Sequence, residues 1–114
     1  MKQPEDESEL RDQVMNLFKQ EHLAYFKHWS GQFSKKGVAD IYLTLPGGRA
    51  CWIELKGPKG KPTNHQIEFM REHSEAGALC FFAYSVEAVI INLAAARVKC
   101  MQRIRRQFPG GLKP

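Results

Sequence analysis

The sequence lacks any apolar stretch close to the roughly 20 residues that a membrane-spanning helix requires, so a transmembrane protein is not expected. Its start is acidic, whereas a secretory signal peptide begins with basic residues and an apolar segment. Cysteine is scarce: Cys51, Cys80 and Cys100 are odd in number and widely spaced, which fits neither a zinc site nor a disulfide framework. We therefore expect one intracellular domain, residues 1–114, with a single hydrophobic core and reduced cysteines.

The last part of the chain lacks acidic residues altogether, although the protein as a whole is only moderately basic. The formal net charge is +5, from 17 Lys and Arg against 12 Asp and Glu. Residues 1–12 carry −3, residues 13–93 carry +2, and residues 94–114 carry +6. A basic segment on a mildly basic body is typical of proteins that bind a polyanion, but it also promotes solubility, and charge alone leaves both explanations open.

The middle of the sequence predicts a β-hairpin that brings two acidic residues together. Residues 40–45 and 50–56 alternate between apolar and polar side chains, and Pro-Gly-Gly at 46–48 suits a three-residue turn. When the two strands pair across this turn, Asp40 lies directly opposite Glu54 and one face is entirely apolar. A slip of one residue would mix the two faces, so the pattern supports this register.

Opposed carboxylates destabilise a hairpin unless something compensates for their charge. A divalent cation would do so, because Mg²⁺ and Mn²⁺ prefer carboxylates and other hard oxygen ligands. Lys56 follows Glu54 by two residues and lies on the same face. The alternative is a simple ion pair between Glu54 and Lys56 on a solvated face, which explains neither the opposed Asp40 nor the basic loop at 57–62.

Periodicity and capping residues predict the elements around the hairpin. We expect helices over residues 8–21 (Ser8 as N-cap), 64–76 (opened by a Thr63-x-x-Gln66 capping box), from 86 onward, and 94–108, and strands over residues 23–29 and 79–84. A helix joins the strands 50–56 and 79–84, so these are expected to be parallel and right-handed. The predicted fold class is therefore α/β, a mixed four-stranded sheet flanked by helices, with a last amphipathic helix that packs on the body or on a partner.

These motifs resemble the VRR-NUC family of the PD-(D/E)xK nuclease superfamily. The family pattern is G-x-P-D, E-x-K, a Lys-Gly turn and a Gln on the next helix, and it matches residues 37–40, 54–56, 59–60 and 66. Ala39 stands in place of the usual proline, which would stiffen the approach to the aspartate without touching the chemistry. The resemblance covers residues 7–93 and leaves 94–114 as a basic helical extension. It implies a restriction-endonuclease-like core and a free-standing phage or bacterial protein in the cytoplasm of a bacterial or phage-infected cell.

The resemblance also implies roles for the hairpin residues. Asp40 and Glu54 would hold one or two Mg²⁺ or Mn²⁺ ions, with the carbonyl of Leu55 as a further ligand. Lys56 would orient or deprotonate the attacking water, or stabilise the developing charge; the sequence does not separate these roles.

Two further positions have both a functional and a structural explanation. Glu9 matches the acidic residue that the family directs from its first helix toward the metal, but a glutamate near a helix start is also favoured by the helix dipole. Gln66 matches the family glutamine beside the metal site and is also the second member of a capping box; both roles can hold together.

Basic side chains are candidates for contact with the DNA backbone. They are Lys35, Lys36, Lys59, Lys61, Arg103, Arg105 and Arg106. For the two lysines before Asp40, a solvated loop tip is an equally good explanation.

The function that the resemblance implies is a metal-dependent DNA endonuclease of replication, recombination or repair. We expect a homodimer that prefers four-way (Holliday) junctions, with the apolar stripe of residues 94–108, and Phe81 and Phe82 beneath it, as the contact. A flap or nicking nuclease without junction preference and a catalytically inactive DNA-binding module are the alternatives. A hydrolase of small phosphate esters is a third, although the chain shows no segment that would enclose a small molecule.

Overall fold

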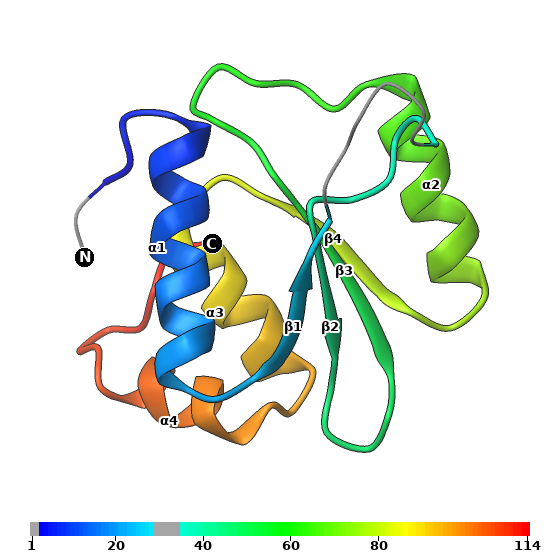
Figure 1. The fold of residues 1–114 in the computed structure, drawn as a ribbon. Coiled ribbons are helices and arrows are strands. Elements are labelled where there is room, and N and C mark those ends of the chain that lie inside the picture. Colours follow the sequence, from blue (N-terminus) through cyan, green and yellow to red (C-terminus); the bar gives the residue numbers. More distant parts are fainter. Residues whose placement is uncertain (1–2, 29–34) are drawn as a thin grey trace.

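The computed structural model describes residues 3–28 and 35–114, and helices alternate with strands much as predicted (Figure 1). The helices are α1 (Glu7–Gln20), α2 (Asn64–Glu75), α3 (Val86–Ala95) and α4 (Lys99–Arg106). The strands are β1 (Ala24–Lys27), β2 (Ile41–Thr44), β3 (Ala50–Leu55) and β4 (Leu79–Ala83). In these two stretches, none of the helices is long and apolar enough to cross a membrane.

The four strands form one mixed sheet in the order β1-β2-β3-β4. The pairs β1–β2 and β2–β3 are antiparallel. Strand β4 pairs in parallel with β3, and helix α2 connects these two strands. In the hairpin, Ile41 pairs with Ile53, so the next positions outward are Asp40 and Glu54. The predicted α/β class, hairpin register and parallel βαβ unit are confirmed.

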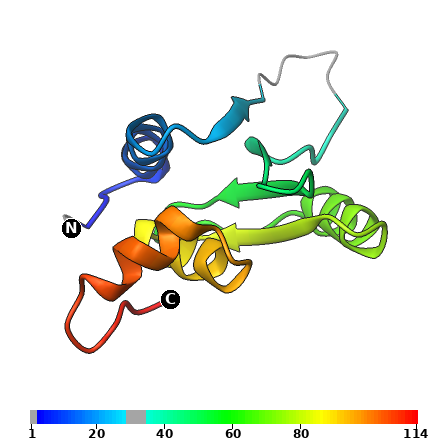
Figure 2. The same ribbon diagram turned by 90° about the horizontal axis from the view of Figure 1, so that it is seen from below.

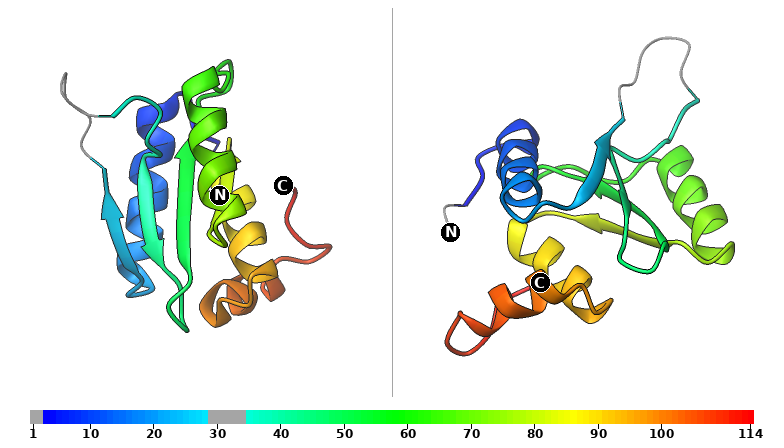
Figure 3. Two further views of the ribbon diagram at one scale, coloured as in Figure 1. Left: turned by 90° about the vertical axis from the view of Figure 1, so that its right-hand side faces the viewer. Right: turned by 60° about the horizontal axis from the view of Figure 1, so that its bottom comes forward.

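Helices cover both faces of the sheet, and each face has its own apolar cluster (Figures 2 and 3). Helices α1, α3 and α4 pack on one face, where the largest fully buried side chains include Leu10, Val14, Phe18, Ile41, Leu43, Ile53, Leu55, Ile90, Leu93 and Met101. Helix α2 packs on the other face, where Phe69 and Met70 contact Trp52 and Phe82. Because side chains alternate along β3, Glu54 turns to the α2 side while its neighbours enter the larger core.

Side-chain caps fix where the helices begin. The Asp6 carboxylate accepts the backbone N–H of Glu9 at 2.8 Å, so Asp6 and not Ser8 is the N-cap of α1. Both residue types are good N-caps, and the chain uses the one that comes first. The predicted capping box of Thr63 and Gln66 is present at the start of α2. Strand β1 is shorter than expected, and the predicted strand end at 29 and the loop residues 30–34 lie outside the described residues.

The C-terminal segment contains the two predicted helices, but the last one begins at Lys99 and is shorter than the expected 94–108. Helix α3 ends at Ala95, and Arg97 adopts a left-handed backbone with φ of 68° before α4 begins at Lys99. The apolar spacing continues across this break because both helices bury the same side of the segment against the larger core.

Most of the apolar stripe of the C-terminal segment is consequently covered within the chain, and only Ile104 and Phe108 of it are half-buried. Ala94, Val98 and Met101 are buried, and Ile104 packs on the larger core. Phe81 packs with the larger core and Phe82 with the α2 cluster, on opposite faces of the sheet. These residues do not form the free face that the predicted dimer contact requires.

Candidate active site

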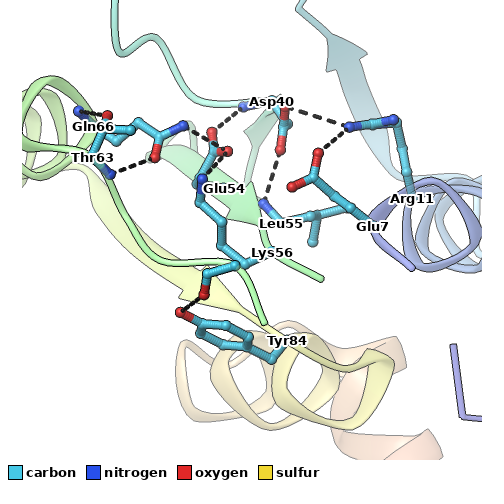
Figure 4. A network of polar contacts seen from close by, with 10 residues as sticks. Glu7, Arg11, Asp40, Glu54, Leu55, Lys56, Thr63, Gln66 and Tyr84 are labelled. Carbon is cyan, nitrogen blue, oxygen red and sulfur yellow. Dashed lines mark hydrogen bonds and ion pairs between the residues drawn. The ribbon is translucent and has the colours of Figure 1, made fainter. Parts of the chain in front are cut away.

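The open end of the hairpin brings Asp40 and Glu54 into direct contact (Figure 4). The backbone N–H of Asp40 donates to Oε1 of Glu54 at 3.2 Å. In return, Oδ2 of Asp40 accepts the backbone N–H of Leu55 at 3.0 Å. Each carboxylate is therefore held by the opposite strand, at the position that the register predicts.

Leu55 contributes only its main chain to this site, and its side chain is fully buried in the core. In an antiparallel pair, the N–H and C=O of one residue face the same neighbouring strand. The N–H of Leu55 bonds to Asp40, so the carbonyl of Leu55 also faces the β2 side. The next residue, Lys56, turns its N–H the other way, to the carbonyl of Ala83 at 3.0 Å.

Lys56 and Gln66 approach Glu54 from its other sides. The Nζ atom of Lys56 lies 3.8 Å from Oε2 of Glu54, and the lysine as a whole is only 8% exposed. The Nε2 group of Gln66 donates to the same Oε2 at 3.1 Å, while Oε1 of Gln66 accepts the backbone N–H of Thr63 at 2.9 Å. One glutamine thus caps α2 and contacts Glu54, so the structural explanation for Gln66 is confirmed, and its role beside a metal stays a prediction.

A glycine allows the segment before Asp40 to lie against the first turn of α2. Gly37 has φ of +85°, and a Cβ added there would lie 2.3 Å from the carbonyl oxygen of His65. Any side chain at this position would therefore push the two backbones apart. This close approach places the start of α2, and with it Gln66, beside the carboxylates.

Helix α1 contributes a basic residue that the sequence analysis did not single out. The Nη2 atom of Arg11 lies 3.9 Å from Oδ1 of Asp40 and donates to Oε2 of Glu7 at 2.9 Å. Glu7 and Arg11 are one helical turn apart, so their ion pair could have been predicted from the sequence. Their proximity to Asp40 could not. Oε2 of Glu9, the predicted metal ligand of this helix, accepts the N–H of Glu5 at 3.0 Å, and its metal role stays a prediction.

Burial controls the protonation of Glu54, which is only 3% exposed. Burial, followed by the charge and hydrogen bonding of Asp40, raises the pKa of Glu54 to about 8, although Lys56 lowers it. At neutral pH a carboxyl group with this pKa is mostly protonated unless a further cation stabilises its charge.

The donor set fits a hard divalent cation. Two adjoining carboxylates and a main-chain carbonyl are oxygen donors, and the raised pKa of Glu54 indicates that the ionised pair lacks compensating positive charge. Within residues 3–28 and 35–114, no group of three or more His, Cys, Asp or Glu side chains is arranged to hold a metal ion. Mg²⁺ is commonly bound by one or two carboxylates, with water and substrate oxygens as its other ligands. Asp40, Glu54 and the carbonyl of Leu55 are the groups that would hold it.

The lysines predicted to contact DNA are exposed on the two chain segments that adjoin this site. Lys59 and Lys61 are exposed on the loop between β3 and α2, and the Tyr84 hydroxyl donates to the carbonyl of Gly60 in that loop at 3.1 Å. Lys35 places its Nζ 6.0 Å from the centre of the Phe69 ring on α2, and Lys36 is exposed.

The predicted arginines lie elsewhere. Arg103 of α4 forms an ion pair with Glu21, at the C-terminal end of α1. Arg11, beside the carboxylates, lies ten residues earlier, or about 15 Å along a helix axis. Arg105 and Arg106 are exposed on the same helix as Arg103. Figure 1 shows α4 and the start of α2 at opposite ends of the molecule, so α4 is not part of the site.

Comparisons with known proteins bear on the fold. No family model matches the sequence. Over 45 residues the chain is 40% identical to "Putative nuclease p44" of Acyrthosiphon pisum secondary endosymbiont phage 1; the match covers 40% of this chain and 45% of that protein, less than half of its length. A solved structure described as a VRR_NUC domain protein matches with a TM-score of 0.67 and 18% identity, over 84% of this chain and 89% of that one. The chain therefore has the fold of a VRR_NUC domain protein, as the resemblance of its motifs predicts.

Proposed function

We propose that this protein is a nuclease that hydrolyses DNA phosphodiester bonds with Mg²⁺ or Mn²⁺ held at Asp40 and Glu54. The observation that carries the proposal is the direct contact of these opposed carboxylates, with Lys56 and Gln66 both directed at Glu54. The fold of a VRR_NUC domain protein and the similarity to a phage protein named as a nuclease support it.

Hydrolysis of a phosphodiester requires an activated water and stabilisation of charge on the phosphate. A bound divalent cation supplies both, by lowering the pKa of water and offsetting the negative charge. Asp40, Glu54 and the carbonyl of Leu55 would hold it. Lys56, with its Nζ 3.8 Å from Glu54, is placed to orient or deprotonate the water or to stabilise the phosphate. Gln66 keeps the Glu54 carboxylate in position, because the helix cap anchors the glutamine in turn.

The surroundings of the site suit a nucleic-acid backbone. Lys59 and Lys61 precede the N-terminus of α2, where both the lysines and the helix dipole favour the phosphates that flank the scissile bond. Lys35 and Lys36 approach from the segment that leads to Asp40. The α4 arginines would contact a different part of the DNA, because they lie at the other end of the molecule.

For the substrate we propose branched DNA, with preference for a four-way junction that a homodimer cuts during replication, recombination or repair in a bacterial or phage-infected cell. A twofold dimer presents two equivalent sites to a twofold junction. The dimer contact must use more than the C-terminal stripe, because Ala94, Val98 and Met101 of that stripe are buried within the chain.

The test is cleavage of labelled four-way junctions, flaps, duplexes and single strands by the wild type and by Asp40→Asn, in Mg²⁺, Mn²⁺ or EDTA. We expect cleavage only in the presence of metal and only by the wild type. Asp40→Asn should still bind DNA, because it removes a charge that repels phosphate. Light scattering of the protein alone and with a junction gives the oligomeric state.

Three outcomes would contradict parts of the proposal. Equal cleavage by Asp40→Asn would remove the two-carboxylate site, and binding without cleavage in every metal would indicate an inactive DNA-binding module. If the protein is a monomer that cuts flaps and does not cut junctions, the proposed nuclease activity would stand, but the dimer and the junction preference would be refuted.

A further inference from the structure

Arg11 makes two contacts with carboxylates. Its Nη2 donates to Glu7 at 2.9 Å and lies 3.9 Å from Oδ1 of Asp40, which is an ion-pair contact and too long for a hydrogen bond (Figure 4). The side chain of Arg11 is 22% exposed, and that of Asp40 is 23% exposed. Both groups are therefore partly shielded from water, where charges interact more strongly than on an open surface.

The two oxygens of Asp40 have different partners. Oδ2 accepts the main-chain N–H of Leu55 at 3.0 Å, as part of the hairpin. Oδ1 faces Arg11. Oδ1 of Asp40 makes no hydrogen bond within the hairpin and is the oxygen nearer to a positive charge, the guanidinium of Arg11.

Helix stability alone does not explain this arrangement. A pair such as Glu7 and Arg11, four residues apart on a helix, contributes only about 0.2–0.5 kcal/mol when it lies on the helix surface. Here the Nε of Arg11 is buried and has no hydrogen-bond partner in the described part of the chain, which is destabilising. A guanidinium with an unpaired N–H beside a long ion-pair contact is suited to exchange partners.

We propose that Arg11 is the internal counterion of Asp40 in the cation-free protein, and that it exchanges Oδ1 of Asp40 for the substrate phosphate when a divalent cation is bound. This inference rests on the proposed function and adds a residue to it. A guanidinium presents a planar fork of donors that matches two oxygens of a phosphate, so the exchange replaces one long contact by bidentate hydrogen bonds. Glu7 keeps the guanidinium near the site in both states, because it lies one turn earlier on the same helix.

The test combines a binding measurement without DNA and a rate measurement with it, on Arg11→Gln, Arg11→Lys and the wild type. Calorimetric titration with Mn²⁺ alone should show Arg11→Gln binding on the order of fivefold more tightly, which corresponds to losing a competing ion pair of about 1 kcal/mol. Single-turnover cleavage at saturating Mn²⁺ should nevertheless be at least roughly tenfold slower, which is what the loss of one charge-assisted contact produces, and Arg11→Lys should recover part of the rate. Lys19→Gln removes the same charge from an exposed position on the same helix and should leave the Mn²⁺ affinity unchanged.

The opposite pattern would overturn the inference. If Arg11→Gln binds Mn²⁺ more weakly than the wild type or equally well, Arg11 only supports the structure around Asp40. If it cleaves as fast as the wild type at saturating Mn²⁺, Arg11 does not contact the phosphate. Both results would leave the nuclease intact, whereas failure of the wild type to bind Mn²⁺ or to cleave DNA would refute the proposed function and this inference with it.

Discussion

Glu54 should make the metal-free protein less stable as the pH rises, and Glu54→Gln should remove that dependence. The pKa of Glu54 is raised from 4.5 to about 8 in the folded chain by burial and by Asp40. Between these two values the folded state binds a proton that the unfolded state has lost. The free energy of unfolding therefore falls with increasing pH from about 4.5 to about 8 and is constant with respect to this group outside that range.

The size of the effect follows from the shift. Each pKa unit corresponds to about 1.4 kcal/mol, so the loss between pH 4.5 and pH 7 is about 3 kcal/mol. Small domains are stable by only about 5–15 kcal/mol, so a change of this size is readily measured. The variant must be compared by its pH dependence and not by its absolute stability. In the wild type, the two oxygens of Glu54 accept the backbone N–H of Asp40 and the Nε2 group of Gln66. A glutamine at residue 54 has one oxygen that can accept and an NH₂ group that cannot, so one of these hydrogen bonds would be lost.

The assay is urea unfolding in EDTA at several pH values from 5 to 8, for the wild type, Glu54→Gln and Glu72→Gln. The last variant makes the same exchange at an exposed position of α2 and should follow the wild type. The difference between the wild type and Glu54→Gln cancels the histidines and other groups that titrate in this range. Parallel pH profiles for these two proteins would refute the reasoning, because Glu54 would then titrate as an ordinary exposed glutamate. When Mg²⁺ replaces EDTA, the pH dependence should become smaller in the wild type and in Glu72→Gln, but not in Glu54→Gln.

Three further predictions concern the site and the basic helix. Mn²⁺ affinity measured by calorimetry should rise by up to about tenfold per unit between pH 6 and 8 and then level off, because the cation must displace the proton of Glu54; a flat profile would mean that Glu54 is not a ligand. Neutralising Arg105 and Arg106 should reduce the salt dependence of DNA binding by up to about 0.9 log units per lost phosphate contact, and an unchanged slope would place α4 away from the DNA. In urea unfolding, Gly37→Ala should destabilise the protein by more than Gly48→Ala. Both glycines have positive φ, but of the two only Gly37 would place a Cβ against backbone atoms. Equal losses of unfolding free energy would mean that the backbone around Gly37 shifts to accommodate the Cβ without loss of stability.

The sequence predicted the features that depend on local pattern. Alternation along the two strands fixes the register of the hairpin, and the register alone brings Asp40 opposite Glu54. The Thr63 and Gln66 capping box is equally local, because both residues belong to one helical turn. The parallel βαβ unit follows from the length of the connection between β3 and β4.

Features that depend on packing between distant segments could not be predicted. The approach of Arg11 to Asp40 requires α1 to lie across the end of the hairpin, 29 positions away in the sequence. The break at Arg97 has no glycine or proline to mark it, and the apolar spacing runs through it without interruption. The burial of Glu54 depends on α2, which the contact between Gly37 and His65 holds against the site.

The burial of Glu54 contradicts one of the two explanations that its sequence context leaves open, the solvated ion pair with Lys56. A solvated ion pair with Lys56 would leave both side chains in water, but they are 3% and 8% exposed. Lys56 also fails to offset the cost of burial, because the pKa of Glu54 remains raised to about 8. A buried ionisable pair of this kind is weak evidence for stability, since apolar residues of similar size would often serve as well or better. The same low-dielectric surroundings strengthen the attraction of both carboxylates for a divalent cation. Removing the charge of Asp40 or of Glu54 should therefore weaken the pH dependence of stability without metal and lower the metal affinity together, which no purely structural role of the pair would require.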